Sequence, residues 1–124
     1  MARCSEGRAA GVAQAPALRS LQSQEEYLLL TVRAVAQDNG WITYHDVDSR
    51  GSEKGWPDLA IARAPEVMFV ELKSSSGRIT KEQQRWIDEL TACGVDARVV
   101  RYGTLEMAAL FADLRKARPA QVAA

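Results

Sequence analysis

Hydrophobic residues recur at the spacing of an α-helix in three stretches of the chain. The first covers residues 23–39, the second begins at Thr80 and is ended by Gly94, and the third covers about residues 105–117. Their apolar stripes are, in order, Leu28, Val32, Val35 and Ala36; Trp86, Ile87 and Leu90; and Met107, Leu110, Phe111 and Leu114. This pattern predicts three amphipathic helices, each packed by one face against a common core.

The predicted helix starts carry a second signal. Ser23 is followed three residues later by Glu26, and Thr80 is followed three residues later by Gln83. This spacing is typical of a capping box, in which each of the two side chains bonds the backbone N–H of the other residue. An Asn-Gly pair at 39–40 closes the first helix.

Four shorter stretches are rich in β-branched, aromatic and aliphatic residues, as β-strands are. They cover residues 41–45, 58–63, 67–73 and 97–102. The second and third are separated only by residues 64–66, so they are predicted to form a hairpin. Residues 46–56 and 74–78 are polar, show no period and are predicted to be loops.

The predicted elements follow the order α-β-β-β-α-β-α. This order indicates an α/β fold, a sandwich in which helices flank a mixed central sheet. The strand–helix–strand unit over 67–102 is expected to be a right-handed parallel crossover. We expect one domain over residues 23–118, with disordered tails at 1–22 and 119–124, where no hydrophobic period is sustained.

The composition is that of an ordinary globular protein, with 47% hydrophobic and 26% charged residues among 124. The formal net charge is zero, so a surface for nucleic acid would have to gather its basic residues on one face. Cys4 and Cys93 have no zinc-binding spacing and predict no structural disulfide, which fits a cytoplasmic setting. No apolar run reaches the roughly 20 residues that cross a bilayer, and no signal peptide is visible.

Three charged residues fall at the ends of the predicted hairpin strands. Asp58 opens one strand, and Glu71 and Lys73 close the other. Residues two apart on a strand share a face, so Glu71 and Lys73 are neighbours while Leu72 is buried opposite. The hairpin brings Asp58 beside them, and we expect both carboxylates to be partly exposed. Two carboxylates at a strand end predict a Mg²⁺ site, with Lys73 as a fixed cation where negative charge develops.

A glutamate and a lysine two apart on a strand are, by themselves, most often a solvated pair at a sheet edge. Here the pair closes an apolar strand, and the neighbouring strand opens with an aspartate that follows Pro57. This combination is much rarer, and it favours a catalytic site over a surface ion pair.

The sequence resembles a nuclease family at these residues. Pro57-Asp58, twelve residues and then Glu71-Leu72-Lys73 resemble the PD-(D/E)xK superfamily. A wider set of motifs resembles its VRR-NUC branch, in the compact form common in phages and bacteria, over about residues 25–102. These motifs are Gly55-Trp56-Pro57-Asp58-Leu59, Val70-Glu71-Leu72-Lys73, Gly77, Thr80-Lys81-Glu82-Gln83, Trp86, Gly94 and Val99-Val100-Arg101.

The resemblance implies a restriction-endonuclease-like fold and a metal-dependent DNA endonuclease that hydrolyses phosphodiester bonds. The implied cofactor is Mg²⁺, with Mn²⁺ as a substitute. By matching position, Asp58, Glu71 and the backbone carbonyl of Leu72 would bind the metal, and Lys73 would be catalytic. Some relatives cut branched DNA such as Holliday junctions or flaps, in DNA repair or recombination, and some act as homodimers.

The resemblance also implies a glutamate on the first helix, where this chain offers Glu25 and Glu26. Glu26 has a competing structural role as the second half of the capping box with Ser23. Glu25 lies three residues before Leu28 and seven before Val32, so it falls on the inward stripe. We favour Glu25 as the residue that reaches the metal, directly or through water, and keep Glu26 as the alternative.

Two further residues have both a structural and a functional interpretation. Gln83 can cap the helix that begins at Thr80, yet it shares a face with Trp86 and Ile87. The resemblance places a glutamine near the active site, so we assign Gln83 to that site. His45 ends a strand near the same edge; a lone histidine is most often structural or on the surface, and a catalytic role is the alternative.

Five basic residues are expected to bind the DNA backbone. Arg78, Lys81 and Arg85 are three and four apart, so they lie on one side of a helix start. Arg50 and Lys54 lie in the loop before the strand that Asp58 opens. The competing interpretation is an ordinary solvated surface.

The sequence therefore favours a DNA endonuclease acting in the cytoplasm of a bacterial or phage-infected cell. One alternative is a non-catalytic DNA-binding module on the same fold, which the intact Asp58, Glu71 and Lys73 argue against. A second is a restriction-type nuclease with sequence specificity. In 124 residues no separate recognition domain is visible, so recognition of DNA shape is preferred.

Overall fold

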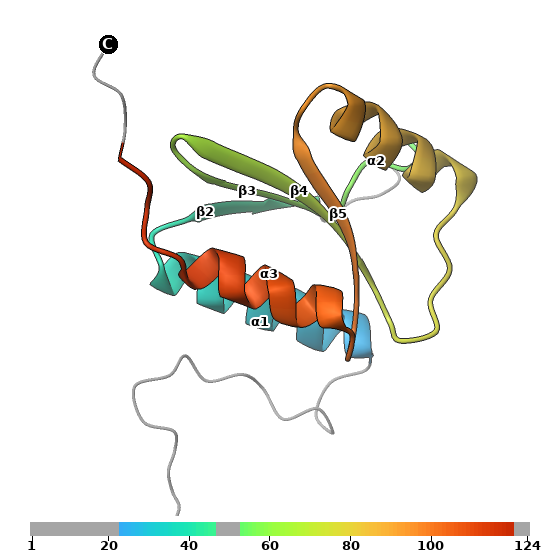
Figure 1. Cartoon of the computed structure of the whole chain (residues 1–124). Coiled ribbons are helices and arrows are strands. Elements are labelled where there is room, and N and C mark those ends of the chain that lie inside the picture. Colours follow the sequence, from blue (N-terminus) through green and yellow to red (C-terminus); the bar gives the residue numbers. More distant parts are fainter. Residues whose placement is uncertain (1–22, 47–52, 121–124) are drawn as a thin grey trace, which may run out of the picture.

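The computed structural model describes residues 23–46 and 53–120. The predicted tail at 1–22, the end of the chain at 121–124 and Arg50 lie outside the described residues. The elements follow the predicted order (Figure 1). They are α1 (Gln24–Asp38), β2 (Ile42–His45), β3 (Leu59–Arg63), β4 (Glu66–Lys73), α2 (Lys81–Ala92), β5 (Asp96–Arg101) and α3 (Leu105–Arg115).

The strands form one mixed sheet in the order β2-β3-β4-β5. The β2–β3 and β3–β4 pairs are antiparallel, and β4 and β5 are parallel. Helix α2 connects the parallel pair, because strands that run in the same direction need a crossover between them. This arrangement confirms the predicted mixed α/β sandwich.

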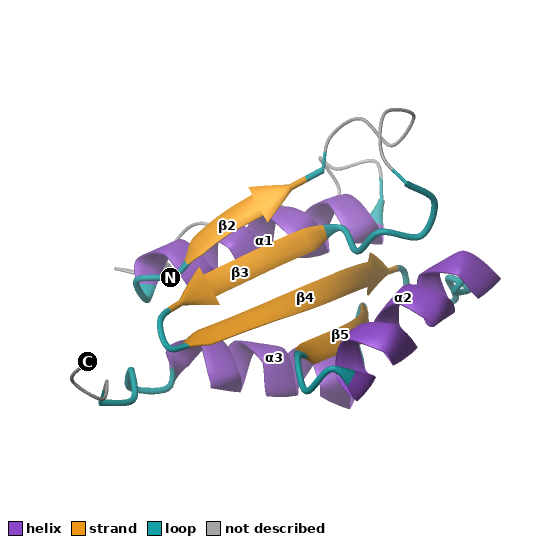
Figure 2. Cartoon of the chain, turned by 90° about the horizontal axis from the view of Figure 1, so that it is seen from above, coloured by secondary structure: helices purple, strands orange, loops and turns teal. Residues whose placement is uncertain are grey.

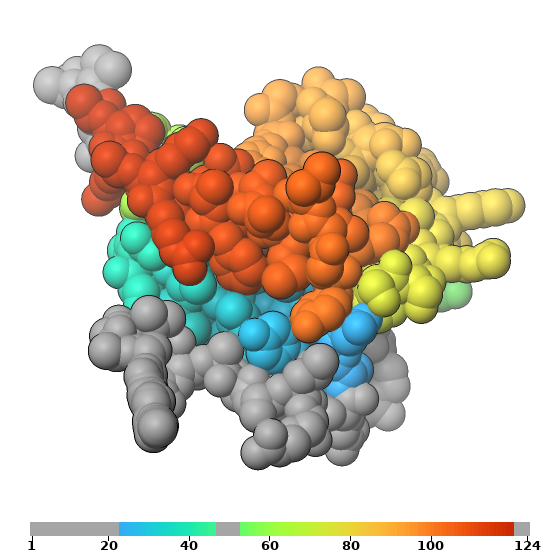
Figure 3. All heavy atoms as spheres, turned by 60° about the horizontal axis from the view of Figure 1, so that its bottom comes forward, coloured from blue at the N-terminus to red at the C-terminus, as the bar shows by residue number. Residues whose placement is uncertain are grey.

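The helices lie on both faces of the sheet. Helices α1 and α3 run together along one face, and α2 lies on the opposite face (Figures 1 and 2). Seen from the α1–α3 side, α3 extends across the outside of the molecule (Figure 3). None of the helices in the described ranges is both long and apolar enough to cross a membrane.

The main core fills the space between the sheet and the α1–α3 pair. The predicted stripe of α1 is buried there, as are Leu110 and Leu114 of α3, while Met107 and Phe111 pack against its edge. The sheet contributes Leu59, Ile61, Met68, Val70, Leu72 and Val100. On the opposite face, Trp56 packs edge-on against both Phe69 and Trp86, under α2.

Several predicted boundaries differ by one or two residues: β3 begins at Leu59 and not at Asp58, β5 covers Asp96–Arg101 and α3 ends at Arg115. Two further differences have identifiable reasons. Trp41 was expected to open a strand, but its backbone N–H bonds Ala36 O at 3.0 Å and so completes the end of α1 instead. Its indole is 3% exposed and donates to Leu114 O at 2.9 Å. Glu66 was expected in the hairpin turn, but it pairs with Arg63 as the first residue of β4, so the turn consists of Ala64 and Pro65 alone.

Arg63 lies at the end of the sheet that is remote from the predicted site. Its side chain is nearly buried and stacks over the Trp41 ring at 4.3 Å. One terminal nitrogen donates to Asn39 O at 3.0 Å, and the other donates to Lys116 O at 3.1 Å. These two carbonyls belong to the C-caps of α1 and α3, so a single guanidinium satisfies both helix ends.

Candidate active site

A hydrogen bond at the adjoining ends of β3 and β4 positions the first residue of the site, Asp58. The β3–β4 pairing ends at Leu59 and Val70, so the Leu72 N–H lies beyond the ladder. Asp58 Oδ2 accepts a hydrogen bond from this N–H at 2.8 Å. Because Leu72 stands between Glu71 and Lys73 on β4, this bond holds the Asp58 carboxylate beside both residues. The structure therefore brings together the three residues that the sequence singled out.

Glu71 is more deeply buried than predicted. Asp58 is half-buried, as expected, but Glu71 is only 2% exposed, so the expectation of a partly exposed Glu71 is wrong. The reason is that α2 lies over this face of β4. Glu71 Oε2 accepts from Gln83 Nε2 at 2.9 Å and lies 3.6 Å from Lys73 Nζ. Leu72, on the opposite face, is buried as predicted.

The electrostatics at Glu71 favour the approach of a cation. Burial and, second, the nearby Asp58 carboxylate together raise the pKa of Glu71 to about 8, although the Lys73 ammonium opposes the shift. The Lys73 ammonium therefore offsets only part of the effect of burial and of the second carboxylate. Added positive charge at this point would stabilise the ionised form of Glu71.

Gln83 has both of its predicted roles at once. Its backbone N–H donates to Thr80 Oγ1 at 3.1 Å, and its Oε1 accepts from the Thr80 N–H at 2.9 Å, which completes the capping box. With Oε1 engaged in this way, the amide nitrogen of Gln83 is directed to Glu71. The cap therefore sets the orientation of a side chain in the site.

The two glutamates of α1 lie at the same end of the sheet. Glu25 Oε2 accepts from the Ser74 N–H, one residue beyond β4, at 3.3 Å. The backbone N–H of Glu26 donates to Ser23 Oγ at 3.0 Å, as the predicted cap requires. Both glutamates line a hollow of about 140 Å³, together with Leu29, His45, Asp58 and Leu72.

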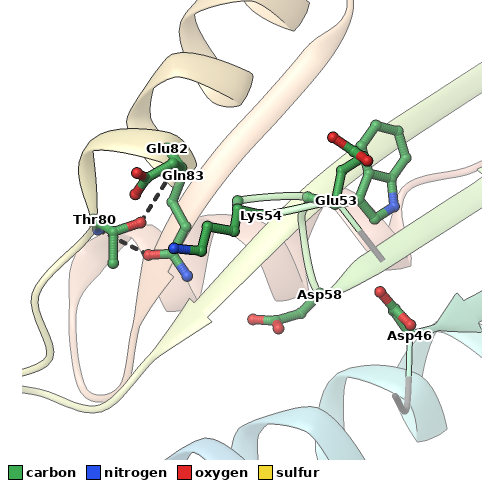
Figure 4. Close-up of a pocket in the computed structure, with 9 residues that line it drawn as sticks. Asp46, Glu53, Lys54, Asp58, Thr80, Glu82 and Gln83 are labelled. Atoms are coloured by element: carbon green, nitrogen blue, oxygen red, sulfur yellow. Dashed lines mark hydrogen bonds between the residues drawn. The ribbon is translucent and has the colours of Figure 1, made fainter. Parts of the chain in front are cut away.

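A larger hollow of about 330 Å³ lies on the α2 side of Asp58 (Figure 4). Its lining includes Lys54, Asp58 and Gln83. Figure 4 shows the side chain of Lys54 extending toward the first turn of α2. Arg85 lines an adjacent hollow that also includes Lys54 and Trp86.

Gly55 was quoted in the family motif without a structural role, and the structure supplies one. Its φ is +86°, and a Cβ placed on it would lie 2.4 Å from the backbone carbon of Glu82. Only glycine allows this approach, because any side chain would collide with the helix backbone. Gly55 thus lets the segment before Asp58 pack against the start of α2.

The predicted DNA contacts are surface residues where the structure describes them. Arg78, Lys81 and Arg85 are exposed around the start of α2, and Lys54 is exposed beside it. Arg50 lies outside the described residues. Their role in binding phosphate stays a prediction.

The donor set fits a small hard cation. Glu71 Oε1 is buried and has no hydrogen-bond partner within the described residues, so it offers an oxygen to an ion. In the described ranges, no group of three or more His, Cys, Asp or Glu side chains is placed so that together they could hold a metal ion. Two carboxylates are nevertheless sufficient for Mg²⁺, which keeps several of its waters and shares the rest of its shell with substrate phosphates.

Comparisons with known proteins identify the family of this chain. The model of the VRR-NUC domain matches residues 9–102. A solved VRR-NUC domain superposes with a TM-score of 0.61 at 17% identity, over 73% of this chain and 96% of that one. Hjc, a Holliday junction resolvase of Archaeoglobus fulgidus, gives a TM-score of 0.47 at 10% identity, over 64% of this chain and 70% of its own. None of the curated proteins matches the chain.

The family match includes the loop before Asp58, all of β4 and the start of α2, which together carry the carboxylates, the lysine and the glutamine described above. It also covers more than half of the chain. The chain therefore belongs to the VRR-NUC family and is a nuclease domain.

Proposed function

We propose that the protein is a divalent-metal-dependent endonuclease that hydrolyses phosphodiester bonds in branched DNA. The observation that carries this proposal is the placement of Asp58 by the Leu72 N–H, beside the buried Glu71 whose Oε1 has no partner among the described residues. A pair of carboxylates kept this close is costly in a folded protein unless a cation compensates for their charge.

Each residue of the site has a distinct task in this chemistry. Asp58 and Glu71 would hold the metal, with the Leu72 carbonyl and with Glu25, directly or through water. When bound, Mg²⁺ supplies Lewis-acid polarisation of the phosphoryl group and makes bound water more acidic. Lys73 places a positive charge next to the scissile phosphate, where negative charge grows as water attacks.

Gln83 acts on the same reaction through Glu71. Its amide holds one oxygen of that carboxylate, so the other oxygen keeps a fixed direction. The exposed basic residues around the start of α2, Lys54 among them, would bind the phosphates that flank the cleaved bond. These contacts would position the backbone and carry no sequence information.

For the described residues, which form a single sheet with three helices, we propose selection by DNA structure and not by base sequence. Discrimination would then depend on the shape and flexibility of the DNA. Association into a homodimer stays a prediction, which sedimentation of the purified protein would test.

The proposal is tested by a panel of single-stranded, duplex, flap and four-way DNA with Mg²⁺ or Mn²⁺. We expect cleavage of branched DNA that requires the metal and is lost in Glu71→Gln. Glu89→Gln is a matched control, because it makes the same change on the exposed surface of α2. Binding of every substrate without cleavage would instead support the non-catalytic DNA-binding module.

A further inference from the structure

Asp58 lies between two hollows on opposite sides of the sheet. The hollow of about 330 Å³ is bounded by the start of α2, and that of about 140 Å³ is bounded by the start of α1. Asp58 lines both. Helices α1 and α2 cover opposite faces of the sheet (Figure 2), so a group held at Asp58 can be approached from either side.

This arrangement matches the geometry of phosphodiester hydrolysis. The attacking and leaving oxygens lie roughly in line, on opposite sides of the phosphorus. Lys73, Glu71 and Gln83 all belong to the α2 side, which therefore suits the attacking water. The leaving oxygen would then depart toward the α1 side, where it needs a proton donor.

We propose that His45 is this donor, and that it protonates the leaving ester oxygen. The proposal rests on the function proposed above. His45 is the last residue of β2 and pairs with Leu59, the neighbour of Asp58. The next residue, Asp46, donates its backbone N–H to Asp58 O at 3.3 Å, which ties the end of β2 to the site.

The imidazole of His45 lies on the α1 side of the sheet. His45 and Thr43 share a face of β2, and Thr43 Oγ1 accepts from Arg33 of α1 at 3.1 Å. His45 is half-buried in the smaller hollow with Asp58, and neither of its ring nitrogens bonds another described residue. Both nitrogens are therefore available to a substrate, and imidazole is the side chain most often used to transfer such protons.

In the proposed step, the oxygen of water forms a new bond to phosphorus and gives up one proton to solvent, as the bond between phosphorus and the leaving ester oxygen breaks. The imidazolium of His45 gives its proton to that oxygen, so the product leaves as an alcohol. The neutral imidazole regains a proton from solvent before the next cycle.

The test compares two DNA substrates that differ in one atom. In the first the leaving atom is oxygen; in the second it is sulfur, at the bridging position that the products of the parent enzyme identify. A sulfur leaving group needs no protonation. We expect His45→Ala to lower cleavage of the oxygen ester about 100-fold or more, as loss of a general acid does, and to cleave the sulfur ester at nearly the parental rate.

The controls separate this proposal from folding and from the function itself. His45→Gln keeps a polar side chain at the same position, and Tyr44→Phe changes its neighbour, which is largely exposed. Tyr44→Phe should match the parent on both substrates. Equal losses on the two esters in folded His45 variants, or no loss on the oxygen ester, would overturn the role of His45. A parent enzyme that cuts neither ester would overturn the proposed function instead.

Discussion

The side-chain amide of Gln83 joins Thr80 to Glu71, since its oxygen accepts from the Thr80 N–H and its nitrogen donates to Glu71 Oε2, each at 2.9 Å. The first residue of the cap and the buried carboxylate are thus connected through one side chain. Glutamate at this position could also complete the capping box, but it could not donate a hydrogen bond to Glu71 Oε2.

This relationship predicts that stability and activity separate in Gln83→Glu. Glutamate completes a capping box as well as glutamine does, so the helix start should be kept. The donor to Glu71 is lost, and a third carboxylate enters the site. We expect cleavage to fall at least 10-fold, on the scale of a lost hydrogen bond to a charged group, with little change in the melting temperature.

Two further variants identify which role of Gln83 is affected. Gln83→Ala should lose activity and also about 1 kcal/mol of stability, because the cap is removed as well. Gln84→Glu adds the same charge one residue away, on the exposed face of α2, and should cleave like the parent. Parental activity in Gln83→Glu would show that the bond to Glu71 has no part in the reaction.

Removal of either carboxylate should abolish both cleavage and stabilisation by metal. We expect Asp58→Ala and Glu71→Gln to stay folded and inactive. Mg²⁺ should raise the melting temperature of the parent, because an ion that binds only the folded state stabilises it, and should leave both variants unchanged. Thermal scans with and without the ion measure this, and equal stabilisation of all three proteins would remove these residues from the metal site.

Lys73→Met should spare metal binding and remove catalysis. A lysine ammonium is not a ligand for Mg²⁺, so the ion should still raise the melting temperature of the variant. Cleavage should fall by 100-fold or more, since the positive charge that we propose to face the phosphate is lost. Single-turnover assays at saturating Mg²⁺ measure the chemical step, and a near-parental rate would exclude Lys73 from it.

The two glutamates of α1 should differ in their effects. Glu25 approaches the end of β4 through Ser74, so Glu25→Gln should lower cleavage strongly with little loss of stability. Glu26→Gln should change neither, because glutamine also serves in a capping box. Parallel cleavage assays and melts of the two variants decide between them. The reverse result would assign the metal-binding role to Glu26.

The stability of the metal-free protein should depend on pH through Glu71. Its pKa is raised from 4.5 to about 8, so the folded state holds this proton more tightly than the unfolded chain does. The resulting stabilisation is present in full below about pH 4.5 and is lost as the pH rises through 8. The melting temperature of the parent should therefore fall relative to Glu71→Gln over this range. Parallel curves for the two proteins would contradict the shift.

The sequence predicts the elements well because each has a local cause. Hydrophobic period, caps and turn residues each act within a few neighbours, and the order of elements follows from them. The predicted start of a strand at Trp41 is wrong because it depends on contacts that are not local. Its backbone ends a helix and its indole bonds Leu114, 73 residues away, and no local pattern reports a contact of that range.

The sequence predicts which residues form the candidate site, but it predicts their burial and their contacts only in part. Strand periodicity places Glu71 and Lys73 on one face, and the hairpin brings Asp58 to them. The burial of Glu71 depends on where α2 crosses the sheet, and that depends on packing between distant segments. Gly55 illustrates the same limit: its approach to Glu82 requires a glycine, yet the sequence shows only that a glycine is there.

Arg63 and Asp58 stand at the two ends of β3, about 17 Å apart for a strand of this length. The guanidinium bonds the C-cap carbonyls of α1 and α3 at the far end, while the candidate catalytic residues lie at the near end, where α1 and α2 begin. The contacts that secure the two helix ends and the proposed chemistry are therefore separated along a single axis. A substitution at the near end should leave the contacts of Arg63 intact.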